Sequence, residues 1–420
     1  MTERQGVAEP TFERIMMVER QSEDEHHGPP FMQQLPSPQP GSGQAGEIIA
    51  QGSKQLSTPQ DPAKWRDAGR NVTRYSLRSG DGGHTWIADP NIRVGQVIDR
   101  TTGEMFSLRP SGIPLVTDEG EPMTEAWYIQ NWQKGRDMGR SVVLSRSSDG
   151  GRTWTAVDVT DQFHNYPGAG LAWVVGHGIQ LQRGQHAGRL LIPARYFGAK
   201  WEPFDTDAHN VISYRGGEGW VWEENGVHVS EILNEHAHNC VAYSDDHGQT
   251  WRWGGSSQGY AGEACIVELS DGSVYINNRN HDPRTLGYRS WAISRDGGTT
   301  FIEFGVDKTL VEGRCHAELA RHSFPEGDEP GRILFLNPAV YDNVIQRPAP
   351  RHHMTVRLSY DDGATWPISK CLWEGPGGYS DMIVLDDGTI LCGFEVSESG
   401  TPRDEVMLCR FNMAWLESDA

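Results

Sequence analysis

Short β-type segments that end in tight turns recur along the 420-residue chain. The apolar, β-branched segments Val142–Leu144 and Thr355–Leu358 each precede a run rich in Ser, Asp and Gly, the pattern of a strand that ends in a turn. A further strand is predicted over Phe12–Val18. No apolar run reaches the roughly 18–20 residues that a membrane-spanning helix needs. The pattern therefore favours an all-β protein.

One turn motif, Ser-x-Asp-x-Gly-x-Thr-aromatic, occurs five times. The copies begin at Ser79, Ser147, Ser244, Ser294 and Ser359. In such a turn the Asp carboxylate accepts backbone N–H groups, the Gly supplies a positive φ, and the Ser and Thr hydroxyls add local hydrogen bonds. The final Trp or Phe is expected to pack into the sheet beneath. We assign these motifs a structural role and no catalytic one.

The spacing of the motifs predicts the number of repeated sheets. Their starting residues are 70 apart on average, enough for one four-stranded blade of ~40–50 residues plus loops. The chain length then predicts a six-bladed β-propeller of four-stranded antiparallel blades, with the last blade closed by strands from both chain ends. Seven blades would need two in the longest interval, which instead shows one insertion, residues 198–238.

The domain organisation follows from a change in composition near residue 45. Residues 1–45 are polar and rich in proline, so we interpret them as an N-terminal arm with the first strands. Residues 46–420 are predicted to form a single propeller domain.

Composition and charge narrow the class of partner and the compartment. The net charge of −20 repels phosphate backbones and anionic headgroups, so nucleic acid and membrane surfaces are not expected partners. The six cysteines lie in the second half without a CxxC pair, which favours free thiols, although disulfides stay possible. No basic-then-apolar leader is visible. We therefore expect a cytoplasmic protein, or a secreted or periplasmic one if a leader was removed.

The motifs resemble those of the sialidase superfamily, and later segments extend the resemblance. Similar segments cover the chain from about residue 46 to 417 and are residues 176–194, 262–280, 332–339, 351–370 and 378–395, with FNMAWLE near the end. The resemblance implies a retaining exo-glycosidase that hydrolyses terminal nonulosonic (sialic) acid from glycoconjugates. It implies an acidic-sugar substrate and no cofactor or metal, and it does not predict an oligomer.

The chemistry of the substrate explains the residue types of that family. A sialic acid bears a carboxylate on its anomeric carbon, which repels an anionic nucleophile, so the family uses a neutral Tyr hydroxyl. A phenol of pKa ~10 needs an adjacent base, which is a Glu. A separate Asp acts as acid and base, and arginines hold the substrate carboxylate.

By resemblance, three residues of this chain are the expected catalytic groups. Tyr379, in Gly-Tyr-Ser-Asp, matches the nucleophile, and Glu263, in Gly-Glu-Ala, matches its base. Asp67, twelve residues before the first turn motif, resembles the acid/base position. Each has a structural alternative: Tyr379 as a core phenol, Glu263 in an ion pair with Arg279, and Asp67 as a turn or helix cap.

The expected substrate-binding residues are Arg279, Arg351 and Gln34. Gln34 precedes Leu-Pro where the family has an Arg-Ile-Pro motif. A Gln there would lose a charge-assisted contact of roughly 1.5–3 kcal/mol, about 10- to 150-fold in binding. The arginines that could replace it are Arg66, Arg70, Arg74 and Arg14.

Two alternatives for the function stay open at this point. The propeller could act as a glycosidase or lyase on another acidic sugar such as a uronate, or it could bind carbohydrate without turnover. His236, His238 and Cys240 alternate along one predicted strand, a weak pattern for a metal site. Glu318 stands where the family more often has a small hydroxyl residue, so it could change substrate choice or be inert.

Overall fold

The computed structural model describes the chain in thirteen segments. They are residues 9–22, 25–36, 46–56, 72–110, 142–163, 168–173, 176–198, 211–212, 221–224, 227–228, 237–343, 350–397 and 404–418. These residues form antiparallel strands almost throughout, with one short α-helix, α5 (Met413–Glu417), and one turn of 3-10 helix, η3 (Thr160–Gln162). None of the described helices has the length and apolar composition to cross a membrane.

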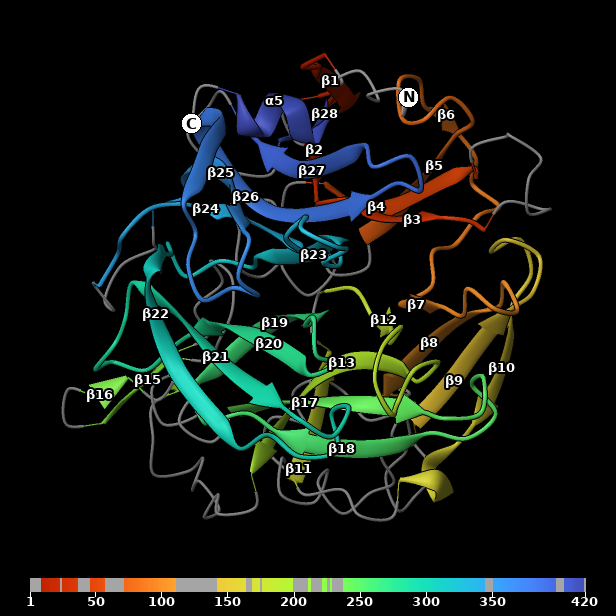
Figure 1. Ribbon diagram of the computed structural model, residues 1–420, viewed down its shortest axis with the longest axis vertical. Helices are drawn as coiled ribbons and strands as arrows, with labels where there is room; N and C mark the ends of the chain where they lie inside the picture. The colour runs from red at the N-terminus through yellow and green to blue at the C-terminus, as the bar shows by residue number, and fades with distance from the viewer. Residues whose placement is uncertain are drawn as a thin grey trace.

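The strands form antiparallel sheets that follow one another around a common centre in the order of the chain (Figure 1). The strands are described in groups of four neighbours. The first group is β3 (Phe31–Gln34), β4 (Ile48–Leu56), β5 (Val72–Ser79) and β6 (Ile87–Ala88). The second is β7 (Val97–Ile98), β8 (Met105–Pro110), β9 (Val142–Ser147) and β10 (Thr155–Asp158), and the third is β12 (Ile179–Gln180), β13 (Leu190–Gly198), β17 (Ala237–Ser244) and β18 (Arg252–Ser256). The fourth group is β19 (Ala261–Glu268), β20 (Val274–Asn280), β21 (Tyr288–Ser294) and β22 (Glu303–Val311). The fifth is β23 (Glu318–Ser323), β24 (Arg332–Pro338), β25 (His352–Ser359) and the first part of β26 (Ile368–Val384). The last is the second part of β26 with β27 (Ile390–Val396), β28 (Glu405–Phe411) and β1 (Phe12–Val18).

Two features complete the topology. The long strand β26 belongs to two groups, because its residues up to Pro376 pair with β25 and those from Gly377 pair with β27. The remaining strands are β2 (Glu25–His27), which also pairs with β4, β11 (Gly168–Trp173), which also pairs with β13, and a small sheet of β14 (Val211–Ile212), β15 (Val221–Glu224) and β16 (Val227–His228). The all-β propeller of four-stranded antiparallel sheets is confirmed.

The last sheet combines the two ends of the chain. β1 pairs with β28, with Phe12 opposite Phe411, so its outermost strand comes from the first residues. This strand has the bounds that the sequence predicted. β3, also within residues 1–45, pairs with β4 of the first sheet. The predicted arm therefore contributes strands to the same sheets as the rest of the propeller.

The repeated turns have the predicted hydrogen bonds. In one copy, Gly248 N donates to Ser244 Oγ at 2.9 Å, and Thr250 donates to Asp246 through N at 2.8 Å and Oγ1 at 2.6 Å. The Trp251 ring is fully buried. The other four copies repeat the Gly–Ser and Thr–Asp bonds. The motifs thus end strands and anchor the sheets, as predicted.

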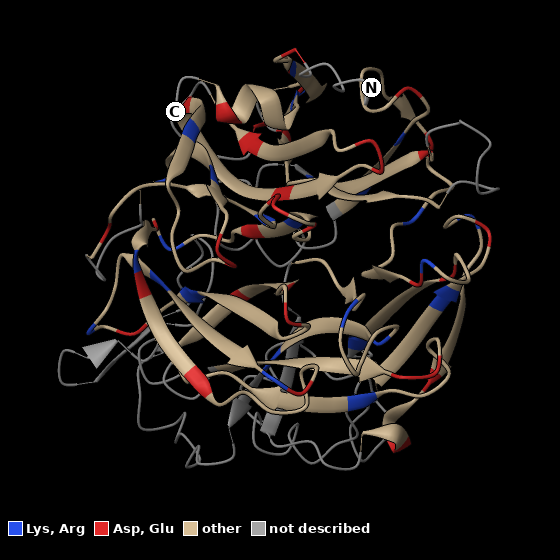
Figure 2. Ribbon diagram, in the orientation of Figure 1, with Lys and Arg blue, Asp and Glu red and all other residues tan. Residues whose placement is uncertain are grey.

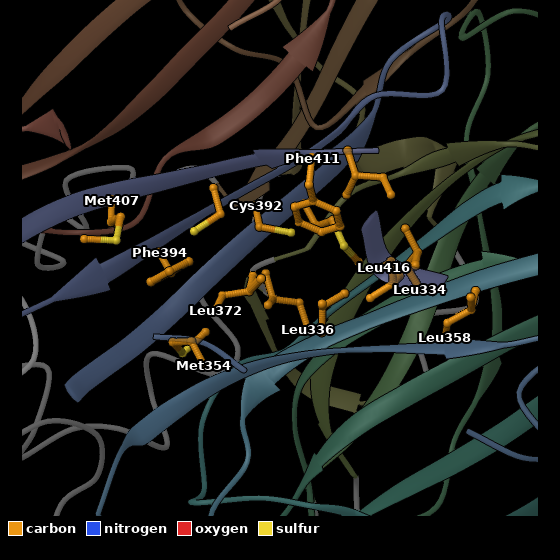
Figure 3. Close-up of a cluster of buried hydrophobic side chains, with 14 of the residues drawn as sticks. Leu334, Leu336, Met354, Leu358, Leu372, Cys392, Phe394, Met407, Phe411 and Leu416 are labelled. Carbon is orange, nitrogen blue, oxygen red and sulfur yellow. The ribbon is translucent and has the colours of Figure 1, made fainter. Parts of the chain in front are cut away.

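Apolar side chains fill the space between neighbouring sheets. One buried cluster joins the last two groups through residues such as Leu336, Met354, Leu372 and Phe394 (Figure 3). Five of the six cysteines are buried, and all six are free thiols. Asp and Glu lie on strands and turns all around the molecule (Figure 2), in keeping with the acidic composition.

Candidate active site

Three of the predicted residues come together from two sheets. Glu263 lies on β19, Arg279 on the neighbouring β20, and Tyr379 on β26. The Tyr379 hydroxyl donates a hydrogen bond to Glu263 Oε1. Arg279 Nη1 donates to the Tyr379 hydroxyl oxygen at 3.2 Å and to Glu263 Oε2 at 3.0 Å. The three side chains therefore form one closed network of phenol, carboxylate and guanidinium.

Irregularities in the strands aim two of these side chains. Between Ala261 and Ala264 the register of β19 gains one residue relative to β20, and between Gly377 and Ser380 β26 gains one relative to β27. An extra residue in one strand is a β-bulge, which bends the strand and redirects a side chain. Glu263 and Tyr379 lie in these bulges, and Tyr379 N donates to the buried Glu395 at 2.9 Å.

Arg351 lies against the same network. Its Cζ is 5.3 Å from the centroid of the Tyr379 ring, and its Nη2 donates to the carbonyl oxygen of Arg314 at 2.9 Å. Arg314 has a left-handed backbone (φ 47°) and forms an ion pair with Asp342 at 3.2 Å. The predicted residues Arg279 and Arg351 thus both lie against Tyr379, one at its hydroxyl and one over its ring.

Further cations near the network were missed by the sequence analysis. Burial, and then the positive charges of Arg279, Arg195 and Arg314, lower the pKa of His281 well below its ordinary value. The imidazole is therefore neutral at pH 7, while the surrounding guanidinium groups stay charged. No sequence motif marked Arg195 or Arg314, because each comes near the network only when the propeller is folded. These guanidinium groups, with Glu263 as an opposing charge among them, are donors that suit an anionic ligand.

Gln34 does not lie with the other predicted residues. Its side chain is buried, and its Oε1 accepts from Asp386 N at 2.9 Å. Asp386 is seven residues beyond Tyr379, where β26 has ended and the chain turns back. Gln34 is therefore bonded beyond the end of β26, apart from the phenol–carboxylate–guanidinium network, and its role in substrate binding stays a prediction.

The other predicted positions lie apart from the network or outside the described residues. Asp67, Arg66, Arg70 and His236 belong to segments that the structure does not describe. Arg14 lies on β1, the outermost strand of the last sheet, opposite Cys409.

Arg74, the remaining arginine suggested as a replacement, lies near two other arginines. Burial first, and then the charge of Arg74, lower the pKa values of Arg93 and Arg109.

In the weak metal pattern, His238 Nδ1 lies 3.0 Å from the Ser257 carbonyl oxygen and Cys240 is buried. Among the described residues, a set with the spacing of metal ligands forms elsewhere, from His177, Glu318 and Asp381.

Comparison with known proteins identifies the family. Residues 96–392, more than half of the chain, match the family model of the BNR repeat-like domain. The chain belongs to the sialidase superfamily with BNR repeats. A sialidase of Micromonospora viridifaciens is 30% identical over 358 residues, which are 81% of this chain and 46% of that protein. A sialidase of Bacteroides fragilis is 24% identical over 352 residues, 76% of this chain and 53% of that protein. The chain thus spans about half the length of these relatives.

Solved structures of the sialidase superfamily share the fold. The Hadza microbial sialidase Hz136 superposes with a TM-score of 0.59 at 20% identity, over 93% of this chain and 66% of that one. The intramolecular trans-sialidase from Ruminococcus gnavus gives a TM-score of 0.59 at 16% identity, over 93% and 96% of the two chains. At these identities the likeness concerns the propeller alone.

Proposed function

We propose that this protein is a retaining exo-glycosidase of sialidase type that releases terminal nonulosonic acid through a tyrosine nucleophile. The observation that supports this proposal best is the contact of the Tyr379 hydroxyl with Glu263 and Arg279. A phenol bonded to a carboxylate has a base in place, and the guanidinium at 3.2 Å stabilises the developing phenolate.

In the proposed reaction, the Tyr379 oxygen attacks the anomeric carbon while its proton passes to Glu263. The bond to the leaving oxygen breaks, and that oxygen receives a proton from an acid, the role proposed for Asp67 on sequence grounds. A water molecule, deprotonated by the same acid/base residue, then attacks the anomeric carbon. The bond from that carbon to the Tyr379 oxygen breaks, and the oxygen takes its proton back from Glu263. The two displacements together retain the anomeric configuration.

Arg351 and Arg279 are proposed to bind the substrate carboxylate. Charge-assisted bonds from guanidinium to carboxylate are among the strongest hydrogen bonds in proteins, and their planar geometry fixes orientation. Burial lowers the pKa of His281 first, and the charges of Arg279, Arg195 and Arg314 lower it further, which supports the presence of several cations near Arg279. Arg314, whose carbonyl oxygen positions Arg351, is one of these cations.

The first sheet gives a reason to keep a second candidate. Met32 N donates to Asp381 Oδ2 at 2.7 Å, so β3 (Phe31–Gln34) lies beside β26 near the candidate site. This strand, FMQQ, carries no lysine or arginine. A clamp without an arginine from β3 leaves a different acidic sugar, such as a uronate, as the alternative substrate.

A matched pair of variants tests the proposal. We expect the wild type to hydrolyse a fluorogenic sialoside and Tyr379→Phe to lose at least 100-fold in kcat, the lower range for one positioned catalytic group. Tyr275→Phe is the control, because this buried tyrosine on β20 contacts Asn277 rather than the network. Incubation with a fluorinated sialosyl inhibitor should add mass to the peptide that contains Tyr379.

Three outcomes would contradict the proposal. Equal turnover by wild type and Tyr379→Phe would remove the phenol from the reaction. Unsaturated product from a uronate glycoside, without sialoside hydrolysis, would identify a lyase. Sugar binding without any turnover would identify a carbohydrate-binding propeller.

A further inference from the structure

Three ligand-type side chains converge from three parts of the propeller that are far apart in sequence. His177 precedes β12, Glu318 begins β23, and Asp381 lies on β26. One donor atom from each lies within 4.8 Å of the others. Glu318 is fully buried, and Asp381 and His177 are 2% and 9% exposed. Such a set of imidazole and two carboxylates, closed off from water, is unusual in a protein interior.

The cluster lies next to the candidate active site along the chain. Asp381 follows Tyr379 by two residues on β26. His316 precedes Glu318 by two residues, and its ring centroid is 5.8 Å from that of Tyr379. The cluster is nevertheless separate from the phenol–carboxylate–guanidinium network, because none of its three residues contributes a hydrogen bond there.

The imidazole of His177 is held from its outer side. Gln33 Nε2 lies 3.1 Å from Nδ1, and the Phe31 ring stacks on the imidazole with centroids 4.3 Å apart. These contacts fix the ring plane and leave Nε2 directed inward, 2.5 Å from Asp381 Oδ1. A hydrogen-bonded outer nitrogen is the usual support of a metal-binding histidine.

The two carboxylates are held in the same way. Asp381 Oδ2 accepts from Met32 N at 2.7 Å, which leaves Oδ1 facing His177. Glu318 Oε1 accepts from Leu319 N at 3.1 Å. Glu318 Oε2 has no hydrogen-bond donor among the described residues, although the side chain is fully buried. One oxygen of Glu318 is thus fixed, while the other lacks the partner that its burial requires.

One histidine lies near the unfilled oxygen of Glu318. His316 Nε2 is 3.5 Å from Glu318 Oε2, but neither ring nitrogen of His316 has a hydrogen-bond partner among the described residues. His316 therefore does not satisfy Glu318 Oε2 with a hydrogen bond, and a buried carboxylate oxygen without a partner is costly.

We propose that His177, Glu318 and Asp381 bind a divalent transition metal ion of the Zn²⁺ class. Imidazole with carboxylates is a donor set for such ions, with bonds of about 2.0–2.2 Å, so two ligands of a tetrahedral ion lie about 3.3–3.6 Å apart. The donor atoms now span up to 4.8 Å, and His177 Nε2 is 2.5 Å from Asp381 Oδ1, so the side chains would shift by about 1 Å on binding. The ion would neutralise the carboxylates, satisfy Glu318 Oε2 and link β23, β26 and the segment before β12.

This site was not expected from the sequence. Glu318 was considered only for its effect on substrate choice, and no spacing along the chain connects it to His177 or Asp381. The proposed metal has a structural role and takes part in no step of the proposed reaction. Its test therefore does not depend on glycosidase activity.

Metal content, thermal stability and a spectroscopic probe test the site. The purified full chain should contain about one Zn²⁺-class ion per molecule by elemental mass spectrometry. Removal of the ion with a chelator should lower the thermal midpoint, and added Zn²⁺ should restore it. Co²⁺ loaded in place of Zn²⁺ should give visible d–d absorption that Zn²⁺ displaces.

Variants distinguish this site from metal bound elsewhere. Glu318→Gln should weaken Zn²⁺ binding at least 10-fold and abolish the Co²⁺ absorption, because a neutral amide is a poor ligand. Glu268→Gln is the control: Glu268 is also buried, but it accepts N–H groups of Gln182 and Arg183 on a different part of the propeller. This variant should keep its metal. Absence of bound metal with no thermal response to Zn²⁺, or equal Zn²⁺ affinity in Glu318→Gln and wild type, would overturn the proposal.

Discussion

Replacing Glu263 by Gln separates the proposed base from its structural role. The carboxylate accepts from the Tyr379 hydroxyl and from Arg279 Nη1 at 3.0 Å. A glutamine has nearly the same shape and keeps an oxygen that can accept a hydrogen bond, but it cannot take a proton. The variant therefore keeps the arrangement of the network and removes its basicity.

The expected losses in activity and in stability differ in size. A positioned general base contributes about 10²- to 10⁴-fold to a rate, or about 2.7–5.4 kcal/mol of barrier. Arg279 also loses its anionic partner, with side-chain exposures of 7% for Arg279 and 15% for Glu263. Because the amide oxygen still accepts, this loss should cost about 1–3 kcal/mol of folding free energy. At an assay temperature well below its unfolding transition the variant stays folded, so its loss of activity reflects the missing base and not unfolding.

The assay compares kcat on a fluorogenic sialoside with the thermal midpoint of each variant. Glu268→Gln is the matched control, because it lies on the same strand β19 and loses a buried carboxylate without touching Tyr379. It should lose stability and keep kcat. If Glu263→Gln keeps more than a tenth of the wild-type kcat, the carboxylate is not the base, and its contact with Tyr379 is a structural ion-pair network.

Three further perturbations test the site, the turns and the core. Arg351→Met should lower kcat/KM about 10- to 150-fold by removing a charge-assisted contact, and an unchanged value would exclude Arg351 from the clamp. Hydrogen bonds from Thr85 lower the pKa of Asp81 from 3.8 to about 2. The stability that Asp81 adds is complete above pH 3.8 and is lost as the pH falls towards 2. The thermal midpoint of Asp81→Asn should therefore change less with pH in that window than the midpoint of the wild type. Arg289→Met should cost about 3–5 kcal/mol by denaturant unfolding, because it leaves Glu312 charged and buried; a loss below 1 kcal/mol would show that Glu312 finds another partner.

The fold could be predicted because its turns are encoded locally. The Ser244, Gly248, Asp246 and Thr250 bonds of this motif join residues at most four positions apart, so the sequence alone contains these interactions. The strand Phe12–Val18 was predicted from its own composition, and closure of the propeller from the need to cover a sheet edge. Local bonds and a general rule were sufficient for these features.

The candidate site was predicted only where segment resemblance reached it. Glu263 and Tyr379 are 116 residues apart, and nothing local joins them. Each follows a glycine, Gly262 or Gly378, within a β-bulge. A Gly in a strand suggests a bulge, so this signal was present in the sequence. It could not show that both bulges face the same point, which depends on how the sheets are arranged around the axis.

The place of Gln34 shows what fixes a position in this fold. The Leu-Pro that follows Gln34 suggested a motif match, but the strand register is set by the bond from Met32 N to Asp381. With Gln34 bonded to Asp386, the two contacts occur in the same order on both strands, so β3 and β26 run in the same direction. Asp386 is seven residues beyond Tyr379, so this order places Gln34 where β26 has ended. A local motif does not specify which neighbour a strand faces, so the Leu-Pro alone could not have fixed this position.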